Sequence, residues 1–132
     1  MWEATGLGSE ELLWSSIAFM GGIAGQQQAP CGVLSSSSVF LGLRHRCSLD
    51  DKQRAKEART LIRQQAADLV KGFEEKFGTI ICREMIRFDT SDPVEYEKFR
   101  QSGIWRQKCN KAIEFAIDRL YDFEDSRETA AS

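Results

Sequence analysis

The sequence predicts an all-α fold, a single-domain helical bundle of about five to six helices over residues 1–132. Apolar residues recur at intervals of three and four in its long segments, and capping residues precede several of these segments. No two alternating apolar segments are joined by a hairpin turn, which argues against a sheet. The length fits one domain, in which we expect residues 1–8 and 126–132 to fray.

The first predicted helix covers residues 9–20, with Ser9 as its cap and Leu13, Ile17 and Met20 at helical spacing. Three glycines then predict a loop over residues 21–30. After the loop, residues 31–45 can form a second helix, in which small residues allow close packing.

The third helix is predicted over residues 49–77, where apolar residues follow the helical period and charged residues fill the opposite face. Ser48 or Asp50 could cap its start and Gly78 its end. The apolar face consists of Ala58, Leu61, Ile62, Ala66, Leu69, Val70, Phe73 and Phe77.

Three shorter patterns complete the predicted bundle. A short helix begins near Cys82, and Asp92 followed by Pro93 is typical of the start of a helix that Gly103 closes. The last helix is predicted over residues 109–124. Its expected apolar side consists of Ile113, Ala116, Ile117, Leu120, Tyr121 and Phe123.

Charge and hydropathy exclude several classes of partner. The net charge is -2, and basic residues are interleaved with acidic ones, so we expect no nucleic-acid binding. The apolar stretch 12–24 is too short to span a membrane and follows Glu10 and Glu11, so we expect no membrane association and a cytoplasmic location. Four cysteines in such a chain favour reduced thiols, metal ligands or redox centres over a disulfide framework.

Three of the cysteines, Cys31, Cys82 and Cys109, fall where helices are predicted to start. A helix N-terminus stabilises thiolate over thiol and can lower a cysteine pKa. Thiolates bind iron or zinc and attack disulfides, so these three residues are the candidate redox-active thiols and metal ligands. The fourth, Cys47, would lie about 20 Å or more from Cys31 along one helix, at about 1.5 Å per residue, and is interpreted as incidental.

The sequence resembles the C-GCAxxG-C-C family, whose members are described as putative redox-active proteins. The resemblance covers about residues 10–120 and is carried by FMGGIAGQQQAPCGVLSSSSVFLGL, by the lone Cys82 in FGTIICREMIRFDTSDP and by GIWRQKC ending at Cys109. It implies a helical fold and a cysteine site. The family's first cysteine has no counterpart here, and Ser36 stands where the family has a second glycine.

This resemblance also implies that the glycine loop approaches the sulfurs. Gly22, Gly25, Gly32 and Ser36 are therefore candidate cofactor-binding residues, because small residues allow close approach and a serine hydroxyl can donate to a sulfur. An iron–sulfur cluster or another thiolate-bound metal is the implied cofactor. Neither haem nor a nucleotide is implied, because the sequence contains no CxxCH and no phosphate loop.

Three functions stay open at this point. The first is electron transfer or redox sensing with a metal centre, and the second is thiol–disulfide exchange without a metal. The third is a helical interaction protein, for example a homodimer formed through the apolar N-terminal helix. The redox partner is not identified by the sequence. His45, the only histidine, is interpreted as a helix-end residue and not as a catalytic one.

Overall fold

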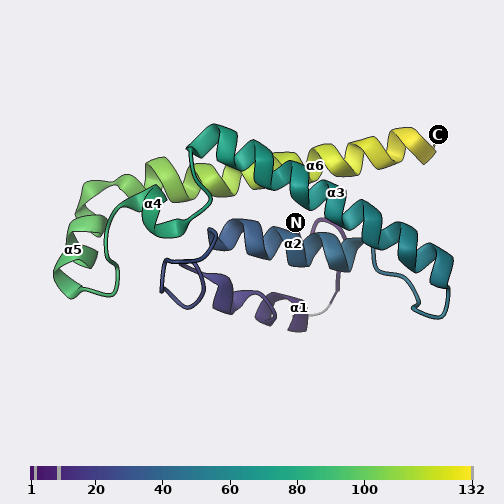
Figure 1. Cartoon of the computed structure of the whole chain (residues 1–132), viewed down its shortest axis with the longest axis horizontal. Coiled ribbons are helices and arrows are strands. Elements are labelled where there is room, and N and C mark those ends of the chain that lie inside the picture. The colour runs from purple at the N-terminus through teal and green to yellow at the C-terminus, as the bar shows by residue number, and fades with distance from the viewer. Residues whose placement is uncertain (2, 9, 132) are drawn as a thin grey trace.

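Three long helices lie alongside one another in the computed structural model, which describes residues 1, 3–8 and 10–131 (Figure 1). They are α2 (Gly32–Arg44), α3 (Lys52–Phe77) and α6 (Lys111–Ala131). The shorter elements are α1 (Glu11–Trp14), the 3₁₀ turn η1 (Ile17–Phe19), α4 (Cys82–Ile86), α5 (Pro93–Ser102) and the π-helical segment η2 (Arg106–Asn110).

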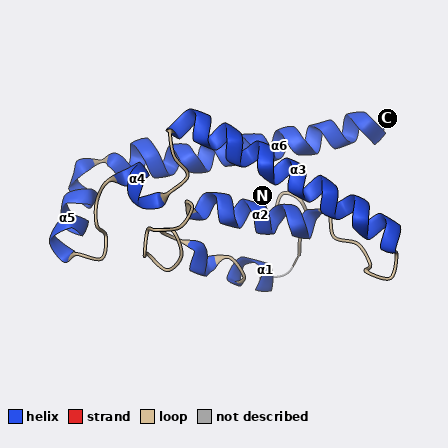
Figure 2. Ribbon diagram, viewed as in Figure 1, coloured by secondary structure: helices blue, strands red, loops and turns tan. Residues whose placement is uncertain are grey.

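The predicted all-α fold is confirmed. Every regular element in Figure 2 is helical, and the part of the chain that the structure describes contains no strand. A single isolated antiparallel bridge joins Pro30 to Ile81. This bridge is the only sheet-like pairing among the described residues, and it holds together two segments that carry candidate cysteines.

The core lies where α2, α3 and α6 meet, with α4 closing one end. Phe73 of α3 is fully buried, and its ring contacts the rings of Phe77 and Phe115 at centroid distances of 4.6 and 6.0 Å. Burying such apolar side chains is the main stabilising contribution in a domain of this size. The buried cluster consists of Leu34, Leu69, Phe73, Met85, Ile86, Ala112 and Ala116.

The second predicted helix, the loop before it and the third helix are confirmed in outline. α3 begins at Lys52 and is capped by Asp51, whose carboxylate accepts a hydrogen bond from the Arg54 N–H at 3.0 Å. The prediction of Ser48 or Asp50 as the cap is therefore wrong, because the capping residue is Asp51. Gly78 ends the helix in a left-handed conformation, as predicted.

The buried face of α3 differs from the predicted face, which did not include the buried Ala55. Leu61 is exposed, whereas Gln65 is buried and hydrogen-bonds His45 at 2.6 Å. Gln65 was not predicted to be buried because it is polar, but a polar side chain can be buried when it has a hydrogen-bond partner. This contact ties the end of α2 to the middle of α3.

The first predicted helix is wrong in its extent. Only Glu11–Trp14 is α-helical, and Ser15 and Ser16 separate it from the 3₁₀ turn η1. Serine competes with the helix for backbone hydrogen bonds, and the Ser16 hydroxyl donates to the Leu13 carbonyl at 3.2 Å. The predicted cap Ser9 lies outside the described residues. The apolar side chains of this region are largely exposed: Leu13, Trp14, Ile17, Met20 and Ile23.

The short predicted helices are confirmed, and the last helix is longer than predicted. Asp92 caps α5 by accepting from the Glu95 N–H at 2.8 Å, and Pro93 is its first residue. α6 continues to Ala131, so residues 126–131, which we expected to fray, are helical. The expected apolar side of α6 is only partly correct, because its buried residues are Ala112, Ala116 and Leu120 and its exposed apolar residues are Ile113, Ile117 and Tyr121.

Candidate sulfur site

The segments that carry Cys31 and Cys82 are paired through their backbones. The Cys31 N–H donates to the Ile80 carbonyl at 2.7 Å, and the Cys82 N–H donates to the Ala29 carbonyl at 3.2 Å. Cys31 therefore lies opposite Ile80, and side chains two residues apart in an extended segment share a face. The pairing places the two cysteine side chains on the same face of the two segments, although they are 51 positions apart in the sequence.

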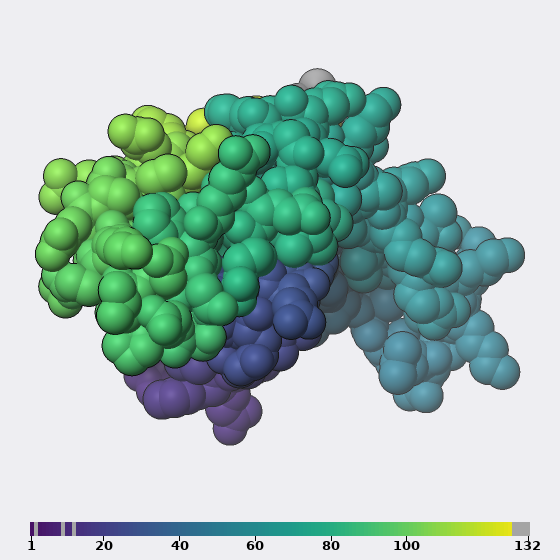
Figure 3. All heavy atoms as spheres, turned by 60° about the vertical axis from the view of Figure 1, so that its left-hand side comes forward, coloured from purple at the N-terminus to yellow at the C-terminus, as the bar shows by residue number. Residues whose placement is uncertain are grey.

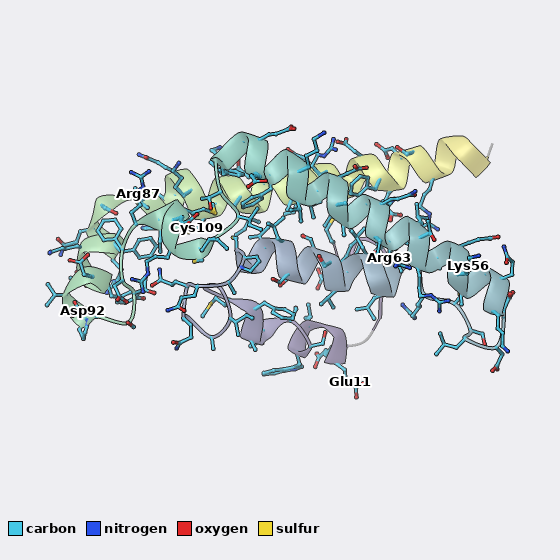
Figure 4. The ribbon with its side chains drawn as sticks, viewed as in Figure 1. Glu11, Lys56, Arg63, Arg87, Asp92 and Cys109 are labelled. Atoms are coloured by element: carbon cyan, nitrogen blue, oxygen red, sulfur yellow. The ribbon has the colours of Figure 1, made fainter. Side chains whose placement is uncertain are left out.

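Cys109 reaches the same region from a third element. It lies in η2, directly before α6, and Figure 4 shows it beside α4. Cys31 and Cys109 both pack against the buried cluster at the centre of the bundle. Each of the three cysteines is partly exposed and none forms a disulfide.

The three sulfurs interact electrostatically. The pKa of Cys82 is raised to about 11, mainly by burial and then by the negative charges that Cys31 and Cys109 carry as thiolates. Burial, followed by the charge on Cys31, also raises the pKa of Cys109. These effects are the ones that nearby thiolates exert on one another, and the prediction that the three cysteines form one site stays a prediction.

The predicted lowering of these pKa values is wrong. Burial raises the pKa of Cys31 as well, and the hydrogen bond from the Val33 N–H only partly opposes this effect. Cys31 caps α2 and Cys82 is the first residue of α4, but Cys109 is not at a helix start because helical structure begins before η2. Near neutral pH these groups are therefore thiols, and desolvation outweighs the helix dipole.

The glycine loop approaches Cys82 through Gly22. Gly22 is buried with φ +65°, and a Cβ at this position would meet the Ala29 carbonyl at 2.8 Å and the Cys82 Cβ at 3.0 Å. Gly25, in contrast, has open space around it. Gly32 approaches the Phe19 carbonyl so closely that an added Cβ would lie 2.4 Å from its oxygen. Ser36 is a partly buried residue of α2. The cofactor-binding roles of Gly22, Gly25, Gly32 and Ser36 stay predictions.

Gln27 is the residue at this site that sequence reasoning missed. Its side chain is fully buried, donates to the Phe88 carbonyl at 2.9 Å and accepts from the Thr90 N–H at 2.9 Å. Its side chain also lowers the pKa of Cys82, against the larger effect of burial, which raises that pKa. Its two neighbours, Gln26 and Gln28, are exposed, so composition alone does not distinguish it.

Cys47 and His45 lie beyond the opposite end of α2 from Cys31, which agrees with the predicted separation of Cys47 from that residue. Cys47 is partly buried in the loop before α3. His45 ends α2, as predicted, but burial lowers its pKa, so the neutral imidazole is favoured there. Nearby, Arg44 makes a bidentate ion pair with Glu124 that joins α2 to α6.

The three thiols match the donor chemistry of iron or zinc, but their arrangement does not match a metal-ligand shell. Soft sulfur donors on separate segments are typical of such centres. Within the described residues, however, no three His, Cys, Asp or Glu side chains are placed so that they could hold a metal ion. As they lie, the residues do not fit a metal ion or cluster.

The family described as putative redox-active protein (C_GCAxxG_C_C) matches residues 1–123. The chain belongs to this family. No curated protein and no solved structure shows a significant match to the chain. Membership in the C-GCAxxG-C-C family is consistent with the observed geometry, because the cysteine-containing segments and the glycine loop meet at one end of the bundle (Figure 1).

Proposed function

We propose that this protein is a thiol-based redox protein in which Cys31, Cys82 and Cys109 form one redox centre. The observation that carries the proposal is the pairing of the Ala29–Cys31 and Ile80–Cys82 segments, which places two thiols on one face. The charges of Cys31 and Cys109, which raise the pKa of Cys82, and the charge of Cys31, which raises that of Cys109, support it as well.

A dithiol–disulfide couple between Cys31 and Cys82 is the chemistry that this geometry supports best. Diagonal neighbours across an antiparallel pair have Cα atoms about 7–8 Å apart, whereas a disulfide requires about 4.4–6.8 Å. Closing the bond therefore requires the two Cα atoms to approach each other by roughly 1–2 Å.

The reaction exchanges a disulfide between the protein and a partner. A thiolate of the pair attacks the partner disulfide and displaces one partner thiolate, and the second protein thiolate then displaces the other. The protein loses two electrons and two protons while the partner disulfide is reduced to two thiols. Because burial keeps the protein thiols protonated, we expect this exchange to be slow at neutral pH and faster at higher pH.

Oxidation with glutathione disulfide followed by alkylation and peptide mass spectrometry tests this proposal. We expect one defined disulfide between Cys31 and Cys82 and no dependence on Cys47, for which C47S is the control. C31S and C82S should each abolish the disulfide. Scattered pairing of all four cysteines, or a disulfide that persists in C31S, would overturn the dithiol proposal.

A metal centre held by the same three cysteines is the second candidate. It is favoured by the donor chemistry of three thiols, which suits an iron–sulfur cluster or another thiolate-bound metal, and it would require the three side chains to move closer together than they lie in the structure. Such a group would supply electron transfer. Iron, zinc and acid-labile sulfide analysis of protein prepared without oxygen, with a visible absorption spectrum, decides between the candidates. A coloured sample whose colour is lost in C109S would favour the metal centre.

Partners and location belong to the same proposal. We infer a redox partner that offers a disulfide or dithiol, and a reducing, cytoplasmic location, because four free cysteines persist best there. Within the described residues, no helix combines the length and the apolar character needed to cross a membrane.

The exposed side chains of Trp14, Ile17 and Met20 support a homodimer. Analytical ultracentrifugation would detect the dimer, and changing all three residues to serine should shift the protein to the monomer.

A further inference from the structure

We propose that the open pocket between the end of α3, α4 and η2 is a binding site for a small aromatic carboxylate. The pocket has a volume of about 920 Å³, within the range of pockets that hold small organic ligands. No cysteine lines it, and the redox chemistry proposed above does not use it. The inference therefore stands or falls independently of that chemistry.

One wall of the pocket is apolar and is held in place by other side chains. Met85 and Ile86 of α4 belong to the buried cluster. The ring of Phe77 packs against two other rings of the core at centroid distances of 4.6 and 5.9 Å, and the ring of Phe88 lies 5.9 Å from that of Phe99. A wall fixed in this way loses little side-chain freedom when a ligand binds. The apolar lining residues are Phe77, Met85, Ile86, Phe88 and Ile104.

The charged part of the lining is positive in balance. Arg87 and Lys108 carry positive charges, against a single negative charge on Glu84. The Glu84 carboxylate accepts a hydrogen bond from the Thr79 hydroxyl, whose oxygen accepts from the Ile81 N–H at 3.1 Å. Within the part of the chain that the structure describes, neither Arg87 nor Lys108 has an ion-pair partner. Both cations are therefore available to an anion in the pocket.

The backbone of Arg87 supports a role for this residue at the pocket. Its φ is +56°, in the left-handed region where residues other than glycine are uncommon, and its N–H donates to the Arg83 carbonyl at 2.8 Å. Gly78 and Gly103 take the corresponding positions at the ends of α3 and α5. At the end of α4 an exposed arginine stands there instead, and strained residues of this kind are often kept for the function of their side chains.

These features favour an anion with a flat apolar body. An uncharged ring compound would make no use of the two cations, and an inorganic anion would make no use of the apolar wall. A carboxylate accepts charge-assisted hydrogen bonds from guanidinium and ammonium groups. An aromatic ring can pack against the rings of Phe77 and Phe88 in the tilted or offset geometry that aromatic pairs prefer. An aromatic monocarboxylate therefore satisfies both parts of the lining with one molecule.

Titration with 2-naphthoate tests the proposal, and the uncharged 2-naphthamide, which has the same ring system, is the matched probe. We expect 2-naphthoate to shift the NMR signals of the Phe88 and Ile104 amides and to bind about tenfold more tightly than 2-naphthamide. Equal affinity for the two probes, or no binding of 2-naphthoate, would overturn the proposal. Shifts confined to the exposed apolar residues near Trp14 and Met20 would also overturn it, because they would place the probe on a different surface.

The variants R87Q and K108Q test the two cations separately. We expect each to weaken the binding of 2-naphthoate about threefold and to leave 2-naphthamide unchanged, since only the carboxylate interacts with these groups. Arg87 is exposed and Lys108 is partly exposed, so both variants should fold, which circular dichroism checks. The control is K56Q, because Lys56 is an exposed cation at the other end of the molecule from Arg87 (Figure 4). Unchanged affinity in both R87Q and K108Q, or equal weakening in K56Q, would overturn the proposal.

Discussion

At the residue scale, burial determines the chemistry of the cysteines more than their position at helix ends does. Cys31 and Cys82 are at helix starts, yet their pKa values rise because the surrounding protein desolvates the thiolate. The sequence showed which residues carry sulfur and where helices begin. It could not show how much of each side chain is covered, because that depends on the glycine loop and on η2, which come from other parts of the chain.

The raised pKa of Cys82 predicts the direction of a pH effect on stability. Below the ordinary cysteine pKa of about 8.5, both folded and unfolded states carry the proton, and the full stability is present. As the pH rises toward 11, the unfolded state loses its proton first, so the free energy of unfolding falls.

Urea unfolding between pH 8 and pH 11 measures this effect. We expect the decrease to be smaller in C82S than in the unmodified protein, with C47S behaving like the latter. A decrease of equal size in C82S and the unmodified protein would show that the Cys82 thiol is not desolvated in the fold.

Gly22 gives a second prediction at this scale. Alanine at Gly22 would meet the Ala29 carbonyl at 2.8 Å and would adopt an unfavourable positive φ, so we expect G22A to lose about 2–3 kcal/mol of stability. G25A has a similar φ but open space around it, and should lose only about 1 kcal/mol. Chemical denaturation measures both. Equal losses would mean that the glycine loop does not pack against Cys82.

At the element scale, the sequence predicted the existence of the helices better than their ends. Asp92 and Pro93 gave the start of α5 correctly, because capping is a local property. The first helix was predicted too long, because serines interrupt it, and the last was predicted too short, because α6 continues to Ala131. η2 could not be predicted, since the wider turn of a π-helix has no periodicity in the sequence that distinguishes it from an α-helix.

The contact between η1 and α2 gives opposite predictions for two glycines of the same helix. G32A would drive a methyl group against the Phe19 carbonyl, 2.4 Å away, and should destabilise the protein by about 2 kcal/mol or more. G42A meets nothing within 4 Å and should stabilise it by about 0.5–1 kcal/mol through helix propensity. Thermal unfolding of the two variants checks the signs, and a stabilising G32A would contradict the close packing of η1 on α2.

At the scale of the whole molecule, the fold joins distant parts of the chain at one end of a helical bundle. The regions of the glycine loop, α4 and η2 lie on the side that faces the viewer in Figure 3. The all-α class and the three cysteines were predicted from the sequence. Their convergence was an expectation from the resemblance, because helix periodicity does not place one helix beside another. Gln27 was missed for the same reason: its burial exists only once the loop, α4 and the turn are assembled.

Binding of phenylarsine oxide tests most directly the central claim that two remote thiols lie within bonding reach, because trivalent arsenic binds a pair of neighbouring thiols without any oxidation. We predict one equivalent bound by reduced, folded protein and by C47S, with Cys31 and Cys82 protected from alkylation. Binding that persists in both C31S and C82S, or no binding to the unmodified protein, would contradict the account.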